Sequence, residues 1–215
     1  MSELRHIPLS QRGDVIENTV TGERAIVLVG SAEATDGRTV VFLGVRAGGA
    51  VVGEHVHGTI TERLRVVSGR LRVRADGVES ELEAGDVVTI HPGTVHDWWN
   101  AGEEEAQIVV EISPGRRFEI MISTLFGLAN DGLTNDRGVP HLLQAAVVAE
   151  EFRDVVRFVR PPRAVQRVAF AMLAPIGRAL GYRPWYERYL RPLGHVDVIP
   201  ELVALVDEIA APAAA

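Results

Sequence analysis

The chain has 215 residues, of which 47% are hydrophobic and 24% charged, so it can bury a sizeable globular core. It contains no cysteine, which excludes disulfides, thiolate metal sites and cysteine nucleophiles, and its 22 basic residues are all arginine, which excludes lysine Schiff-base chemistry. The net charge of −7 argues against general nucleic-acid binding.

Two features bear on where the protein works. Residues 1–14 lack the apolar core of a signal peptide. The longest uncharged apolar run of note, residues 168–177, is about half the length that spans a bilayer. We therefore expect a cytoplasmic protein.

The first half of the chain has the pattern of short strands separated by turns. Residues 23–31 and 38–47 are rich in β-branched and apolar residues. These residues follow one another without the alternation expected of a strand that buries only one face. Residues 70–82 alternate and then turn on Asp76-Gly77, a favoured two-residue hairpin turn. Further strands are expected at 86–90, 95–100 and 106–112. Turn signals every 8–12 residues without helical periodicity predict a sandwich or barrel.

After Pro114 the apolar residues take helical spacing. Residues 117–131 and 140–160 show this pattern, and Pro161-Pro162 forces a break. A third amphipathic helix is expected at 163–180 and a short last one at 200–210. The sequence therefore predicts a mainly β protein, with a β-barrel over residues 1–115 and an α-helical extension over residues 116–215.

Arginines are concentrated in one part of this extension. The segment from Arg157 to Arg191 contains eight arginines and a single acid, Glu187, so it carries +7 and the rest of the chain −14. We expect this segment to pack against the acidic remainder of its own fold or of a partner subunit. The alternative is a site for an anionic ligand or a membrane surface.

A cluster of strong metal ligands lies near the middle of the predicted barrel. In GEHVHGTITE, His55 and His57 project from the same face of a strand, because side chains alternate along it. Glu62 follows a short turn and can face the same pair from the next strand. A single His-x-His is more often a surface or core pair, but residues 85–100, GDVVTIHPGTVHDWWN, supply a further histidine, His96.

Together these two stretches resemble the cupin family. The first cupin motif, G-x5-H-x-H-x4-E-x6-G, is matched at every spacing by Gly49, His55, His57, Glu62 and Gly69. The second, G-x5-P-x-G-x2-H-x3-N, is matched by Gly85, Gly93, His96 and Asn100. Its proline falls one place late, at Pro92, with His91 in the usual slot. The resemblance extends to about residue 115, and the helical extension lies outside it.

The resemblance implies a double-stranded β-helix, a jelly-roll-like barrel with a metal ion in its lumen. His55, His57, Glu62 and His96 correspond one for one to the family's ligands. Three neutral imidazoles and one carboxylate give a divalent centre a net charge of about +1. They would saturate tetrahedral zinc, whereas octahedral Fe, Mn, Ni or Co would keep two open positions for a bidentate substrate, or for one substrate atom plus O₂ or water. The ligand set leaves the choice of metal open.

Strand parity also suggests which residues face the ligand. Trp98 lies two residues after His96 and therefore on the same face of the strand, whereas Trp99 would face outward. On the strand after the turn, Leu64 and Val66 lie on the same face as Glu62. Arg63 and Arg65 lie on the opposite face. We assign Trp98, Leu64, Val66 and Asn100 to a mainly apolar substrate pocket. His91 is expected in solvent, and His6, His141 and His195 are expected at the surface.

Three functions are compatible with these features. The first is a metal-dependent enzyme acting on a small organic molecule, with oxygenation the commonest chemistry of this ligand set and isomerase, lyase or hydrolytic chemistry also open. The second is a non-catalytic, metal-loaded module that binds or senses a small molecule. The third gives the helices a role in assembly or membrane contact. We expect a homodimer, because an exposed sheet edge needs cover, and no nucleic-acid partner.

Overall fold

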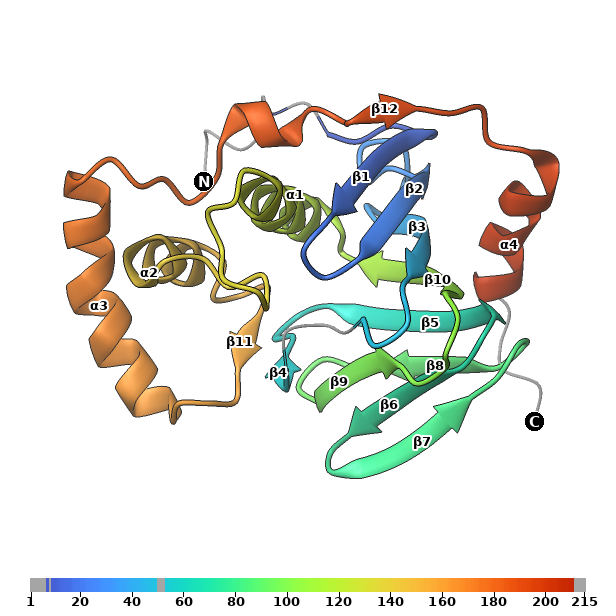
Figure 1. The fold of residues 1–215 in the computed structure, drawn as a ribbon, viewed down its shortest axis with the longest axis horizontal. Helices are drawn as coiled ribbons and strands as arrows, with labels where there is room; N and C mark the ends of the chain where they lie inside the picture. The colour runs from blue at the N-terminus through green and yellow to red at the C-terminus, as the bar shows by residue number, and fades with distance from the viewer. Residues whose placement is uncertain (1–6, 8, 50–52, 211–215) are drawn as a thin grey trace.

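The computed structural model describes residue 7, residues 9–49 and residues 53–210. Its N-terminal half folds into antiparallel strands, and most of its helices follow them in sequence (Figure 1). The strands are β1 (Asp14–Asn18), β2 (Glu23–Val29), β3 (Thr39–Val45), β4 (His55–Val56), β5 (Thr61–Ser68), β6 (Leu71–Ala75), β7 (Val78–Leu82), β8 (Val87–Ile90), β9 (Val95–Asn100), β10 (Ala106–Ser113), β11 (Arg157–Phe158) and β12 (Gly194–His195).

These strands form two sheets that enclose one hydrophobic core. Strand order is β12-β1-β2-β3-β10-β5-β8 in the larger sheet and β11-β4-β9-β6-β7 in the smaller. On β5 the inward residues Leu64 and Val66 are fully buried between the sheets, whereas Arg63 and Arg65 alternate with them and point to the outer face. The predicted mainly β barrel is confirmed.

The hairpin between β6 and β7 forms at the predicted turn. Asp76 and Gly77 both have positive φ, at 47° and 83°, as a two-residue turn between twisted strands requires. Gly69 also has positive φ, and a Cβ there would lie 2.8 Å from the Cα of Ala106, so only glycine fits.

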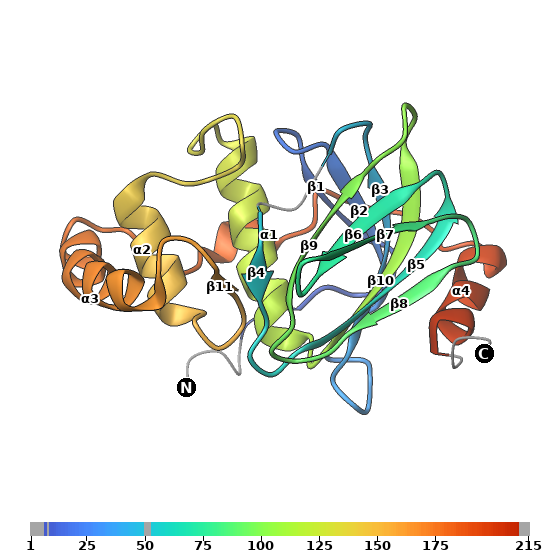
Figure 2. The same ribbon diagram turned by 90° about the horizontal axis from the view of Figure 1, so that it is seen from below.

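The C-terminal helix explains why several strands are apolar on both faces. Helix α4 (Pro200–Ala210) lies against the outside of the larger sheet (Figure 2). Its Val206 and Ile209 pack on Val40 and Val109 in a second hydrophobic cluster. An ion pair between Arg65 on β5 and Glu208 on the helix, with 2.6 Å between nitrogen and oxygen, links the two elements.

The other helices follow the barrel and lie beside its mouth (Figure 2). They are α1 (Arg116–Asn130), α2 (Leu142–Glu151), α3 (Arg163–Ala179) and the short 3-10 helix η2 (Glu187–Leu190). A C-terminal helical extension is therefore present. The boundary at residue 115 stays a prediction, because β11 and β12 of the extension pair with β4 and β1 of the barrel.

One expected helix is wrong in part. The pattern over residues 140–160 predicted a single helix, but α2 ends at Glu151. Phe152 and Val155 are instead buried in the barrel core from a turn, and the chain then runs as β11 along β4. The β-branched residues of 155–159 suit this extended course, and their contacts with the barrel outweigh their helical spacing.

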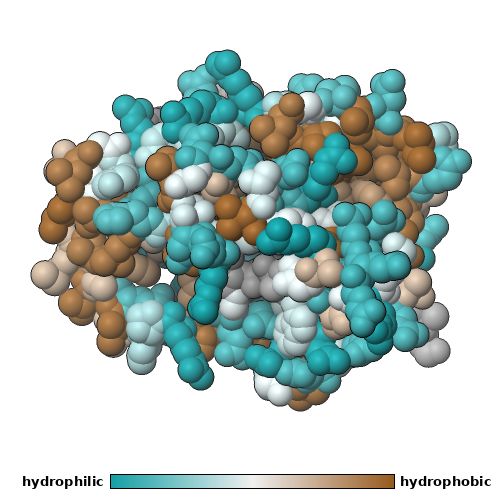
Figure 3. All heavy atoms as spheres, in the orientation of Figure 1, coloured by the Kyte–Doolittle hydropathy of each residue, from teal (hydrophilic) through white to brown (hydrophobic). Residues whose placement is uncertain are grey.

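Helix α3 has an apolar side with little cover. Val165, Val168, Met172, Ile176 and Leu180 follow helical spacing and are 50–66% exposed. They form the apolar area at the left edge of Figure 3, over α3. Among the eight arginines from Arg157 to Arg191, Arg188 alone forms an ion pair with another described residue, Asp131. The expected packing of this segment on its own acidic surface is limited to that pair. None of the described helices combines the length and apolar character that crossing a membrane requires.

Candidate metal centre

The structure brings the four residues of the two sequence motifs together inside the barrel. His55 lies on β4, and its register partner is His96 on the neighbouring β9. His57 follows β4, and Glu62 lies on β5 of the other sheet. One potential ligand atom from each residue lies within 4.8 Å of the others, and all four side chains are buried. This group could therefore hold a metal ion.

The three imidazoles are oriented for metal binding by main-chain carbonyl groups. Nδ1 lies 3.0 Å from the Gly53 oxygen in His55, 2.7 Å from the Val155 oxygen in His57 and 3.0 Å from the Thr94 oxygen in His96. A carbonyl oxygen only accepts, so each Nδ1 carries the proton. Each Nε2 is then the atom available to a metal ion, an arrangement that metal-binding histidines commonly adopt. Without the ion, protonation of Nε2 lets His57 and His96 donate to Oε2 of Glu62.

The electrostatics also favour binding of a cation. Burial, followed by the neighbouring His96 and His57, lowers the pKa of His55 to about 4, so this imidazole is neutral near pH 7. Burial opposes ionisation of Glu62, but hydrogen bonds with His57 and His96 outweigh it and hold the pKa of this carboxyl well below its usual range. Burial opposes protonation of His96, but its hydrogen bond with Glu62 outweighs burial and raises the pKa of this imidazole, so a metal ion would displace that proton on binding. Three imidazoles and an ionised carboxylate fit a first-row divalent metal.

Trp98 supports the carboxylate from the side. Its indole Nε1 donates a hydrogen bond of 3.2 Å to Oε1 of Glu62, while Oε2 faces His96 at 3.1 Å and His57 at 3.3 Å. Trp98 also lines the adjoining cavity. Trp99 points to the other face, where the Arg74 guanidinium lies 5.4 Å from its ring centroid.

The other three residues assigned to the pocket occupy different positions. Leu64 and Val66 are fully buried in the hydrophobic core and are not among the described residues that line the cavity. Asn100 is also absent from that lining, because its side chain binds the main chain at Val45, Gly102 and Glu104. It has a structural role in closing the turn after β9.

The remaining histidines lie away from the metal centre. His91 is exposed at the turn before β9, as expected. His141 and His195 are also exposed; His141 caps α2, and His195 Nδ1 lies 3.1 Å from Asp14. His6 lies outside the described residues.

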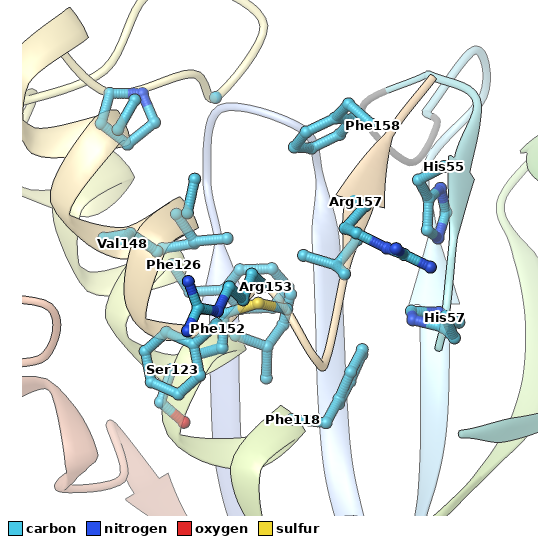
Figure 4. Close-up of a pocket in the computed structure, with 18 of the residues that line it drawn as sticks. His55, His57, Phe118, Ser123, Phe126, Val148, Phe152, Arg153, Arg157 and Phe158 are labelled. Carbon is cyan, nitrogen blue, oxygen red and sulfur yellow. The ribbon is translucent and has the colours of Figure 1, made fainter. Parts of the chain in front are cut away.

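A large cavity opens from the metal centre towards the helices (Figure 4). It has a volume of about 1150 Å³ and is bounded by the barrel, α1, α2, β11 and α3. Most of its wall is apolar, with Phe118 beside His57 and with Phe126 and Phe152 farther from the histidines. The centre thus lies at one end of a chamber that can take an organic molecule of considerable size.

Sequence reasoning missed the part of the chamber that the extension contributes. The carbonyl of Val155, the Phe118 ring and Arg157 all lie at the centre or its chamber, but none belongs to a motif. Val155 belongs to the apolar pattern expected over residues 140–160, yet no local signal indicated that its main chain meets a histidine 98 residues away.

These features define a small β-barrel protein with a buried histidine–carboxylate cluster that could hold a metal ion. Residues 41–112 match the family described as Cupin domain. The chain therefore contains a cupin domain, with the double-stranded β-helix fold, followed by a C-terminal helical extension.

Two curated relatives also match the chain. It is 37% identical over 82 residues to "Polyketide synthase CurC" of Streptomyces cyaneus, covering 37% of this chain and 53% of that protein. It is 36% identical over 93 residues to "Tetracenomycin polyketide synthase protein TcmJ" of Streptomyces glaucescens, covering 42% and 60%. The chain thus spans little more than half the length of these relatives.

Solved structures show more distant similarity. KdgF from Halomonas sp. is 21% identical with a TM-score of 0.40, over 46% of this chain and 84% of that one. An RmlC-like cupin from Shewanella frigidimarina is 21% identical with a TM-score of 0.41, over 53% and 95%.

Proposed function

We propose that this protein is a metal-dependent enzyme of the oxygenase type that acts on a large, mainly apolar organic molecule. The observation that carries the proposal is the position of His55, His57, Glu62 and His96 at the end of the apolar cavity. An Fe, Mn, Ni, Co or Zn ion held by these residues would supply Lewis acidity, and the redox-active ions also electron transfer to O₂.

The residues of the chain divide the remaining tasks. Three carbonyl groups fix the histidine tautomers, and Trp98 fixes the carboxylate of Glu62. The apolar walls from α1 and α2 bind the body of the substrate and exclude water from the reacting end. The relatives named as polyketide synthase proteins support a polyketide as the substrate class.

One observation favours a non-catalytic alternative, a metal-loaded module that binds a small molecule. Both oxygens of Glu62 are already engaged, Oε1 by Trp98 and Oε2 by His57 and His96. With Oε1 bonded to Trp98 and Oε2 directed at the metal position, this carboxylate is not available as a general base. Turnover separates the two functions, because an enzyme changes its substrate and a binding module does not.

The experiment combines metal analysis with oxygen uptake. The wild-type protein, purified without a tag and reconstituted with each metal in turn, should contain about one metal ion per chain. With an apolar polyketide-like aromatic compound such as a naphthol, it should consume O₂ in at least one metal form. His96→Ala should lose the metal and the uptake, whereas the exposed His91→Ala should keep both. Absence of metal from the wild type would overturn the metal centre, and ligand-induced stabilisation without turnover in any metal form would favour the binding module.

We also propose a homodimer in which the apolar side of α3 is covered by a second copy. Four apolar side chains of this helix and Leu180 directly after it are 50–66% exposed, and Arg163, Arg167 and Arg178 lie near them in the sequence. A contiguous apolar surface of this kind is unusual on a monomer. A second copy offers complementary charge, because the chain outside residues 157–191 carries −14. A cytoplasmic location likewise stays a prediction.

A further inference from the structure

Arg157 is a half-buried cation without a partner in the described part of the chain. It lies on β11, outside the matched cupin domain, and lines the cavity. Its guanidinium forms no hydrogen bond or ion pair with any other described residue. Removing a charge from water in part, without a counter-charge, raises its free energy. A negatively charged ligand would offset that cost.

The side chain of Arg157 lines the cavity although its strand register does not direct it there. Arg157 pairs with Val56, whose side chain alternates with those of His55 and His57, whereas Phe158 pairs with His55. Figure 4 shows its side chain extending from β11 towards the rings of these two histidines. A Cβ on Gly58 would lie 3.8 Å from Nη2 of Arg157, so the guanidinium lies beside the residue that follows His57.

Two aromatic rings flank the same space. The Phe158 ring centroid lies 6.4 Å from that of His55, and the Phe118 ring centroid lies 6.1 Å from that of His57. In Figure 4, Arg157 lies between these two phenylalanines. Flat apolar surfaces beside a planar, delocalised cation suit a planar aromatic ligand with an ionised oxygen group.

We propose that Arg157 is the ligand-positioning residue of this site and selects a planar aromatic anion. A carboxylate on the ligand would pair with the guanidinium while a neighbouring hydroxyl oxygen reaches the metal. This proposal rests on the proposed metal centre, since the second oxygen needs a metal to bind. A divalent ion with Glu62 leaves a net charge of about +1, and Arg157 adds +1, so the site favours anions over neutral molecules.

The test compares two probes that differ in charge and share the metal-binding hydroxyl. Nickel-loaded protein, in which an octahedral metal keeps open positions, is titrated with 1-hydroxy-2-naphthoate and with its neutral analogue 1-hydroxy-2-naphthamide, and both dissociation constants are measured by calorimetry. The wild type should bind the carboxylate at least tenfold more tightly, as expected for a charge-assisted pair. Arg157→Gln should remove this preference without changing nickel content. Arg157→Lys should retain part of it, because a lysine keeps the charge but not the bidentate geometry.

The matched control is Arg24→Gln, which makes the same charge change at an exposed position on β2 outside the cavity. It should keep the wild-type preference. Nickel bound at wild-type level together with an unchanged preference in Arg157→Gln would overturn the role of Arg157 alone. Failure of the nickel-loaded wild type to prefer the carboxylate, or to bind either probe, would overturn the ligand class. Failure of the wild type to bind nickel or any other divalent metal would instead overturn the proposed function.

Discussion

The main-chain oxygen of Val155 accepts a hydrogen bond from His57 Nδ1 at 2.7 Å, although 98 residues separate the two in sequence. Because the carbonyl fixes the tautomer of a potential ligand, the helical extension takes part in building the candidate metal centre. The turn that presents this carbonyl is held from α1, where Arg117 donates to the Glu151 carbonyl at 2.6 Å and to Asp154 at 3.0 Å.

Arg117→Met should therefore weaken metal binding without touching a ligand. The substitution keeps an apolar stem over Phe152 but removes the hydrogen bonds that hold the turn. Loss of support for a ligating histidine typically costs about 10–100-fold in metal affinity, and we expect the lower end of that range. Competition with a zinc chelator measures it. Arg153→Met, on the same turn but with a side chain 71% exposed, should retain wild-type affinity. Equal affinities in both variants would show that the turn does not position His57.

Trp98→Phe should act on the carboxylate instead. It removes the donor to Oε1 of Glu62 and keeps most of the buried ring. We expect metal affinity to fall by about tenfold and thermal stability of the metal-free form to fall by about 1 kcal/mol. Trp99→Phe is the control, because that indole lies on the opposite face beside Arg74. A matching loss in the control would contradict the supporting role of Trp98.

Glu23 should make the stability of the fold depend on pH. Burial outweighs its hydrogen bond from Thr21 and raises the pKa of this carboxyl from 4.5 to about 7. Between these values the folded chain keeps a proton that the unfolded chain releases, so stability falls as pH rises through this window and the loss is complete above about pH 7. Glu23→Gln should be more stable than the wild type by up to about 3 kcal/mol at pH 8, and equally stable at about pH 4.

Urea denaturation at both pH values measures this difference. The exposed Glu83→Gln should match the wild type at each pH. A constant offset between Glu23→Gln and the wild type would assign the effect to packing and not to ionisation.

Met172→Glu should break the proposed dimer. Met172 is 64% exposed at the middle of the apolar side of α3, so a charge there would be buried without a partner in the assembly. Light scattering on the eluting protein should show a dimer for the wild type and a monomer for the variant. Val78→Glu, 68% exposed on β7, should stay dimeric. A monomeric wild type that instead partitions into vesicles containing anionic lipids would replace the second copy with a membrane surface.

Much of the barrel and the ligand cluster could be predicted because their signals are local. Alternation on β5 indicated which side chains face inward, Asp76-Gly77 indicated the hairpin, and two motifs with fixed spacings brought His55 and His96 to adjacent strands. Each of these features depends on a few consecutive residues and on the geometry of one strand or turn.

The surroundings of the cluster depend on tertiary contacts that local patterns do not encode. Residues 152–159 have apolar spacing compatible with a helix, and only the presence of β4 and the barrel core makes the extended course more stable. Leu64 lies on the same face of β5 as Glu62, as predicted. The alternation of side chains does not indicate whether an inward residue lines a cavity or lies in the packed core. The role of Arg157 likewise depends on a strand pairing across about 100 residues of chain.

The pairing of β11 with β4 has a mechanical consequence. The same short segment of the extension carries the carbonyl that orients His57, a charged side chain in the chamber and a strand bonded to the backbone of His55. A movement that widens the chamber by carrying β11 and the preceding Val155 outward would also break the hydrogen bond that sets the tautomer of His57. Opening of the chamber would then also lower the affinity of the centre for its metal ion. A ligand that holds β11 in place would raise that affinity.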